Sequence, residues 1–202
     1  SAASYWYEIL ALTDDTHSKV ALQGLKDGSR QGDSTVRYIF SLLGIKTSFK
    51  EKDVNGMPEA LLTRHSRMLN RMDYDFTNQP DLAQTLIAVC PVLGIPFHFT
   101  GLGTLKIKET DRIEAMKREM EKLGYILHEE EGTALSWTGE RCEPMTQPTI
   151  DTYEDHRMAM SFAPLAIKLG EIRINNPEVV SKSYPHYWAD LRKAGFKIQQ
   201  VD

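Results

Sequence analysis

The sequence predicts an α+β fold in which a helix–strand–helix–strand unit occurs three times within one pseudo-symmetric lobe. Three amphipathic segments end at Gly44, Gly124 and Gly195, and a short run typical of a β-strand follows each glycine. Hydrophobic residues make up 41% and charged residues 26% of the 202 residues, which indicates a globular chain. The spacing between the glycines is too long and uneven for a solenoid, so we expect a compact lobe.

Within each unit the apolar residues change from helical to β periodicity and back. In order, the predicted elements are helix 4–12, strand 19–25 and helix 36–43; helix 81–93, strand 96–102 and helix 113–123; helix 155–169, strand 171–175 and helix 184–191. Two further strands are expected at 60–66 and 134–138. Each glycine supplies the left-handed conformation that stops the preceding helix.

Charge and cysteine content exclude several classes of protein. The 24 basic and 28 acidic residues give a net charge of −4, which argues against a general nucleic-acid or anionic-membrane surface. Cys90 and Cys142 exclude a disulfide framework and a four-thiolate metal site, and they fit a reducing compartment such as the cytoplasm. The uncharged stretch 82–105 is broken by proline and glycine, so we expect no membrane span. Because the sequence starts at Ser1 without a methionine, we also expect a piece of a longer chain.

Cations lie at three predicted helix N-termini, where the helix dipole disfavours them. Arg112 follows a predicted N-cap at Thr110, Arg157 follows one at Asp155, and Lys182 precedes one at Ser183. Together with free backbone N–H groups, such cations form a site for phosphate or carboxylate groups. The alternative is that they are solvated surface charges, with Arg112 paired to Glu109 or Asp111.

Three acid–base candidates lie near these cations. Glu109 follows Lys108 directly, Asp81 begins the helix predicted over 81–93, and His156 follows Asp155. Asp81 and His156 also have plainer interpretations, because a carboxylate at a helix N-terminus stabilises the helix and a histidine often has only a structural hydrogen bond. The other histidines show no paired metal-ligand spacing.

The sequence resembles the 5-enolpyruvylshikimate-3-phosphate synthase family at five places along nearly the whole chain: SAASY at 1–5, QGD at 31–33, KIKETDR at 106–112, DHRMAM at 155–160 and KSYPHY at 182–187. This resemblance implies transfer of the enolpyruvyl group of phosphoenolpyruvate to the 5-hydroxyl of shikimate 3-phosphate, with release of phosphate, on the shikimate pathway to chorismate and aromatic amino acids. It implies no metal and no organic cofactor. It also implies two lobes of repeated βαβαββ-type units, the enolpyruvyl transferase fold, with the substrates enclosed between the lobes.

Roles for the candidate residues follow from the same resemblance. Asp81 would bind the shikimate hydroxyls and act as the base, Lys108 would contact shikimate 3-phosphate and assist proton transfer, and Glu109 would exchange the proton of the methylene carbon. The remaining residues would hold or flank the substrates: Arg112, Arg157 and Lys182 at phosphoenolpyruvate, His156 close by, and Tyr5 near shikimate 3-phosphate. The sequence departs from the family pattern at three positions. Lys106 is a tolerable replacement for the family's arginine, Ser1 or Ser4 could replace the phosphate-binding serine missing at Ala2, and the shikimate contact at Thr104 stays open.

The resemblance further implies that this chain is incomplete. Residues 1–50 would close the N-terminal lobe and residues 51–202 would form most of the C-terminal lobe, so we expect the chain alone to lack turnover. Two alternatives remain: the sister enolpyruvyl transferase that acts on UDP-N-acetylglucosamine, and a non-catalytic RNA-binding or interaction module. The charge balance argues against the module.

Overall fold

The computed structural model describes residues 2–24, 31–50, 55–67 and 69–201, and the side chains of 31–33 lie outside this description. Its α-helices are α1 (Ala3–Leu12), α2 (Gln31–Leu42), α3 (Ala83–Val92), α4 (Arg112–Lys122), α5 (His156–Phe162), α6 (Ala166–Leu169) and α7 (Tyr187–Lys193). Short 3-10 helices are η1 (Pro80–Leu82), η2 (Gly103–Ile107), η3 (Ala163–Leu165) and η4 (Pro177–Lys182). The predicted mixture of helices and strands is confirmed.

The strands form three small sheets. The first contains β1 (Lys19–Gln23), β3 (Glu59–Arg64) and β2 (Ile45–Lys50) in that order, all antiparallel neighbours. The second has the order β4 (Met72–Asp75), β5 (Phe97–Thr100), β7 (Ala134–Trp137) and β6 (His128–Glu130), with only the β4–β5 pair parallel. The third pairs β8 (Thr149–Ile150) with β9 (Arg173–Ile174) in parallel. The strands predicted at 60–66 and 134–138 correspond to β3 and β7.

The predicted glycine stops are confirmed. Gly44, Gly124 and Gly195 have φ angles of 94°, 98° and 108° and lie just beyond α2, α4 and α7. Only Gly44 is followed directly by a strand, β2, whereas no strand follows Gly195 within residues 196–201. The expected strand there is wrong because Phe196 and Ile198 pack on a helical cluster instead of joining a sheet.

Prolines account for two further differences. The helix predicted over 155–169 is divided into α5, η3 and α6, because Pro164 cannot donate the N–H of a continuous helix. The helix predicted from Tyr184 begins instead at Tyr187, since Pro185 disfavours helical backbone in the residue before it. The predicted strand end at Leu25 and the motif residue Ser1 lie outside the described residues.

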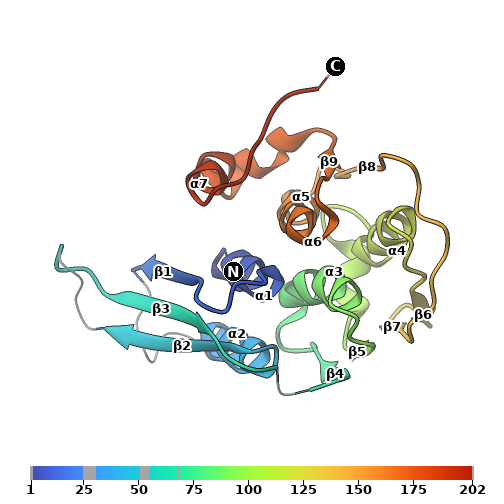
Figure 1. Cartoon of the computed structure of the whole chain (residues 1–202). Coiled ribbons are helices and arrows are strands. Elements are labelled where there is room, and N and C mark those ends of the chain that lie inside the picture. The colour runs from blue at the N-terminus through green and yellow to red at the C-terminus, as the bar shows by residue number, and fades with distance from the viewer. Residues whose placement is uncertain (1, 25–30, 51–54, 68, 202) are drawn as a thin grey trace.

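One hydrophobic core joins the helices that carry the candidate residues. Figure 1 shows α1 between the β1–β3–β2 sheet and α3, and α1 contacts both. Every residue of α3 except the last is buried, which makes it the central helix, and α4 and α5 pack against it. Residues on both sides of position 50, such as Phe40 and Ile87, share this core. The lobe boundary expected at residue 50 stays a prediction. None of the helices described has both the length and the apolar character that a membrane span requires.

Candidate active site

The starts of three neighbouring segments bring the candidate residues together. Asp81 lies in η1 just before α3, Lys108 and Glu109 lie between η2 and α4, and Arg112 is the first residue of α4. Asp155, His156 and Arg157 lie at the start of α5. In Figure 1 the helices α3, α4 and α5 lie side by side, and α3 contacts each of the other two. We call these seven residues the charged cluster.

Asp81 is the point at which the cations of the charged cluster meet. Its Oδ1 lies 3.2 Å from Arg112 Nη1 and 3.7 Å from Lys108 Nζ, and its Oδ2 lies 3.8 Å from Arg157 Nη2. The Asp81 side chain is 43% exposed, so its oxygens are open to solvent on one side. The structure therefore brings Arg112 and Arg157 to one carboxylate.

Arg112 is buried and fully partnered. Its side chain is 2% exposed, its Nε donates to Asp155 Oδ2 at 2.8 Å, and its Nη2 donates to Asp155 Oδ1 at 3.2 Å and to Glu109 Oε2 at 2.5 Å. This two-point contact with a carboxylate is the geometry that the planar guanidinium favours. Pairing of Arg112 with Glu109, one of the two pairings considered from the sequence, is what the structure shows.

The helix caps differ at one position from those predicted. Asp111, not Thr110, is the N-cap of α4, and its side chain accepts from Glu114 N at 3.1 Å. The chain enters the helix one residue later than expected because Asp111 keeps an extended backbone, with ψ of 95°. Asp155 is the N-cap of α5 as predicted, and its Oδ1 accepts from Arg157 N at 2.9 Å.

Tyr5 supports Arg157 from inside the protein. The Tyr5 side chain is buried, and Arg157 Nη1 donates to its hydroxyl and to the backbone oxygen of Asp81, each at 3.4 Å. Burial raises the pKa of Tyr5 to about 12, although the charge of Arg157 opposes this shift. The hydroxyl therefore stays protonated at neutral pH. That Tyr5 lies near shikimate 3-phosphate stays a prediction.

Two of the three acid–base candidates, Glu109 and His156, differ in charge at neutral pH. A backbone hydrogen bond at Glu109, together with the charge of Arg112, lowers the pKa of Glu109, so its half-exposed carboxylate is ionised. Burial lowers the pKa of His156, so this imidazole is neutral at pH 7 even though its Nδ1 lies 3.9 Å from Asp155 Oδ1. Glu109 can thus accept a proton, and His156 can act as a neutral hydrogen-bonding group.

Lys182 does not occupy the predicted position before a helix N-terminus. It is the last residue of η4, Ser183 follows as the cap of that 3-10 helix, and α7 begins only at Tyr187. Its side chain is exposed and makes no ion pair with any residue in the described ranges. Because η4 packs against α5, the backbone of Lys182 still lies on the element next to Arg157.

The charged cluster is balanced rather than cationic. Three permanent cations contact three carboxylates in it: Lys108, Arg112 and Arg157, and Asp81, Glu109 and Asp155. The buried Asp155 carboxylate forms its ion pair with Arg112. An incoming anion must therefore compete with Glu109 and Asp81 for the arginines. At Arg112 carboxylates of this chain contact the guanidinium, as in the alternative considered from the sequence. That Arg112 binds phosphoenolpyruvate stays a prediction. The Arg112–Asp155 pair could not be predicted, because no sequence pattern links residues 43 positions apart.

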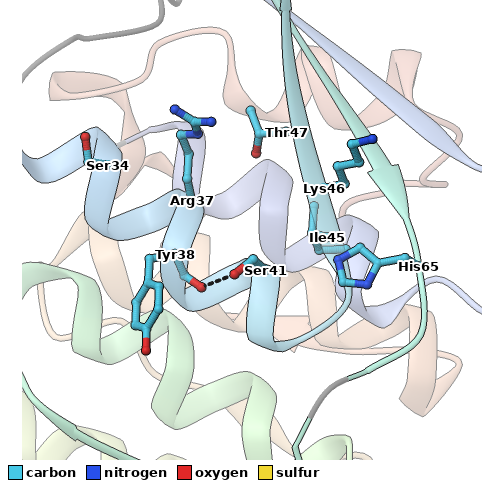
Figure 2. Close-up of a pocket in the computed structure, with 8 residues that line it drawn as sticks. All are labelled: Ser34, Arg37, Tyr38, Ser41, Ile45, Lys46, Thr47 and His65. Carbon is cyan, nitrogen blue, oxygen red and sulfur yellow. Dashed lines mark hydrogen bonds between the residues drawn. The ribbon is translucent and has the colours of Figure 1, made fainter.

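A separate polar groove lies between α2 and β2. Figure 2 shows the residues that line it: Ser34, Arg37, Tyr38, Ser41, Ile45, Lys46, Thr47 and His65. Thr47 Oγ1 is 2.7 Å from the Tyr7 hydroxyl, and the Arg37 guanidinium lies over the Phe49 ring at 4.6 Å. None of the predicted site residues lines this groove. Within the described ranges, no group of histidine, cysteine, aspartate and glutamate side chains is placed to hold a metal ion.

Comparison with known proteins agrees with the resemblance seen in the sequence. The family model of EPSP synthase (3-phosphoshikimate 1-carboxyvinyltransferase) matches residues 1–191. A 3-phosphoshikimate 1-carboxyvinyltransferase of Bacteroides fragilis is 54% identical over 199 residues, which are 98% of this chain and 47% of the relative. One of Methanospirillum hungatei is 31% identical over 194 residues, which are 96% of this chain and 42% of the relative.

Solved structures show the same fold. EPSP synthase from Acinetobacter baumannii matches with a TM-score of 0.70 and 19% identity, over 100% of this chain and 46% of that one. The enolpyruvyl transferase NikO from Streptomyces tendae matches with a TM-score of 0.55 and 18% identity, over 98% of this chain and 43% of that one. The chain thus spans about half the length of the curated relatives it matches. Neither the UDP-N-acetylglucosamine enzyme nor the RNA-binding module is favoured by these matches. Because the family model covers most of the chain and the relatives align over nearly all of it, the chain belongs to the EPSP synthase (3-phosphoshikimate 1-carboxyvinyltransferase) family.

Proposed function

We propose that the protein containing this chain transfers the enolpyruvyl group of phosphoenolpyruvate to the 5-hydroxyl of shikimate 3-phosphate and releases phosphate. Membership of the family supports the reaction. The observation that carries it to these residues is the meeting of Lys108, Arg112 and Arg157 at the Asp81 carboxylate. Cations gathered at one carboxylate can bind the anionic groups of two substrates beside a candidate base.

In the proposed reaction, the oxygen of the 5-hydroxyl of shikimate 3-phosphate attacks C2 of phosphoenolpyruvate while Asp81 removes the proton of that hydroxyl. The methylene carbon C3 gains a proton, which produces a tetrahedral intermediate. Loss of phosphate from C2 and of a proton from C3 then restores the double bond. Arg112, Arg157 and Lys182 hold the phosphate and carboxylate of phosphoenolpyruvate, and cations at the leaving phosphate stabilise the charge that develops there.

Glu109 is the proposed proton carrier at C3. Its carboxylate is ionised in this structure, because a backbone hydrogen bond and Arg112 lower its pKa. Phosphoenolpyruvate brings negative charge to the same arginine, and a nearby like charge raises the pKa of a carboxyl group. The proton that Glu109 takes up on substrate binding is then the one that it delivers to the methylene carbon.

The remaining half of the relatives' length is proposed to supply the second lobe that encloses the substrates. A half-site loses positioning and exclusion of water, so the chain alone is expected to lack turnover while retaining weak affinity for phosphoenolpyruvate. The proposal needs no metal or organic cofactor. The proposed location is the cytoplasm, because free thiols such as Cys90 and Cys142 remain reduced there.

Phosphate release with both substrates tests the proposal. The assay is run on this chain alone and on this chain joined to the N-terminal portion of the Bacteroides fragilis relative. We expect turnover only for the joined protein, and loss of that turnover in its Asp81→Asn variant. Turnover by this chain alone would contradict the two-lobe proposal, and full activity of the Asp81→Asn variant would contradict the role of Asp81.

A further inference from the structure

A second buried carboxylate lies on α4, two helical turns beyond Arg112. Glu119 is 0% exposed, and it is not among the residues predicted from the sequence or the resemblance. Positions seven residues apart lie on nearly the same side of an α-helix, about 10 Å apart along its axis. Glu119 and Arg112 therefore face the same neighbouring segment of the chain.

That segment binds Glu119 through both carboxylate oxygens. Oε1 accepts from Lys122 Nζ at 2.6 Å and from the backbone N–H of Asp151 at 2.8 Å. Oε2 accepts from the Tyr153 hydroxyl at 2.7 Å. Lys122 Nζ also donates to Thr149 O at 3.0 Å and to Asp151 Oδ2 at 3.1 Å. Each oxygen of this buried carboxylate is thus satisfied by residues 149–153 or by the lysine that also holds them.

These contacts follow one another in sequence order. Thr149 is hydrogen-bonded to Lys122, and Asp151 and Tyr153 are hydrogen-bonded to Glu119. Asp155 is hydrogen-bonded to Arg112. The segment 149–155 therefore runs antiparallel to α4 and is attached to it at three levels. The final level is the ion pair that binds Arg112 and caps α5.

The backbone between the last two levels adopts an unfavourable conformation. Tyr153 and Glu154 have φ angles of 54° and 57°, in the left-handed region that residues with a Cβ rarely occupy. Such backbone persists only where the surrounding contacts fix it. The turn leads to Asp155, which pairs with Arg112. Asp155 N donates to Thr152 O at 2.8 Å, Thr152 Oγ1 donates to Asn175 O at 3.0 Å, and the Glu119 contacts hold the residues on either side of Thr152.

We propose that Glu119 is a positioning residue of the charged cluster: by holding Asp151 and Tyr153 it fixes the turn that presents Asp155 to Arg112 and starts α5 at His156 and Arg157. Its consequence for catalysis rests on the proposed function, whereas its effect on the geometry of Arg112 does not. Glu119 touches no predicted substrate-binding residue, so it acts through the segment that it holds.

The charge states of the partners suit a permanent attachment. Burial, followed by the hydrogen bond to Glu119, raises the pKa of Tyr153 to about 12. Partial burial lowers the pKa of Lys122, but hydrogen bonds to Glu119 and Asp151 outweigh it and raise the pKa overall. Both groups therefore remain protonated donors throughout the neutral pH range.

Hydrogen exchange at Arg112 tests the inference without requiring activity. The Nε–H of Arg112 is buried and donated to Asp155, so its proton NMR signal is expected to exchange slowly with solvent. We expect Tyr153→Phe and Glu119→Gln to accelerate this exchange about tenfold or more, because either change loosens the turn. Glu121→Gln is the matched control, since it changes an exposed glutamate on the same helix and leaves the exchange unaltered.

A second measurement separates the inference from the proposed function. In the joined two-lobe protein, Tyr153→Phe is expected to lower kcat/KM for phosphoenolpyruvate about tenfold or more, because small displacements of positioning groups reduce rates strongly. If the joined protein is inactive, the proposed function fails while the exchange measurement still decides the role of Glu119. Unchanged hydrogen exchange at Arg112 in Tyr153→Phe would overturn the inference. Because Tyr153→Phe removes only one hydroxyl, it still decides the test if Glu119→Gln does not fold.

Discussion

Removing the Asp155 carboxylate tests how the charged cluster contributes to stability. Asp155 is 0% exposed, it pairs with the buried Arg112, and its Oδ1 caps α5. Breaking a buried ion pair costs about 3–5 kcal/mol because the remaining charge is left without its partner. Glu109 and Asp81 still contact Arg112, so we expect the lower end, about 3 kcal/mol, for Asp155→Asn. Asparagine keeps the cap, whereas Asp155→Ala loses it and about 1 kcal/mol more.

Urea unfolding of the two variants, followed by circular dichroism, measures both contributions. For a chain of this size, the loss in Asp155→Asn corresponds to a fall in Tm of about 6–12 °C. Asp73→Asn is the control, because the Arg71–Asp73 pair is exposed and worth less than about 1 kcal/mol. A loss below about 1 kcal/mol in Asp155→Asn would refute the buried-pair reasoning. Equal losses in the asparagine and alanine variants would refute the contribution of the cap.

Three further predictions concern other parts of the molecule. Among the residues that the structure describes, neither oxygen of the buried Glu8 carboxylate has a hydrogen-bond partner, and burial raises the pKa of Glu8 well above 4.5. The free energy of unfolding therefore falls as pH rises above 4.5, and Glu8→Gln should raise it more at pH 8 than at pH 5; an equal gain at both pH values would contradict this. Gly44→Ala should lower the free energy of unfolding by about 1–3 kcal/mol, more than Gly24→Ala does. Both glycines have positive φ, but only at Gly44 would a Cβ approach a backbone oxygen to 2.6 Å, so thermal melts that rank the two variants the other way would exclude this cause. Tyr5→Phe removes the hydroxyl that accepts a hydrogen bond from Arg157, so it should weaken phosphoenolpyruvate binding a few-fold in calorimetric titration. An unchanged affinity would contradict this prediction.

Local features of the fold could be predicted from the sequence, because they depend on neighbouring residues. The apolar period of α2 and the positive φ of Gly44 follow from local sterics and burial, and both were predicted. The breaks at Pro164 and Pro185 were missed because the apolar period continues through them. The strand expected after Gly195 was wrong because a sheet needs a neighbour, and the sequence of one segment does not show whether a neighbour is present.

The candidate site was predicted only in part. The cation at the start of α4 was visible in the sequence, but its partner Asp155 comes from the start of another helix, so the pair depends on tertiary packing. The proximity of Asp81 to these residues was suggested by the family resemblance and is shown here by its contacts. Glu119 gave no signal, because a glutamate within a charged helix looks like an ordinary surface residue.

Titration with phosphoenolpyruvate, followed by NMR of the arginine side chains, tests the central claim most directly. That claim is that the charged cluster binds a small molecule with a phosphate and a carboxylate. We predict saturable shifts of the Arg112 and Arg157 side-chain signals that inorganic phosphate reverses in competition. Shifts confined to Arg37 in the groove of Figure 2, or no saturable shift at either arginine of the charged cluster, would contradict the account.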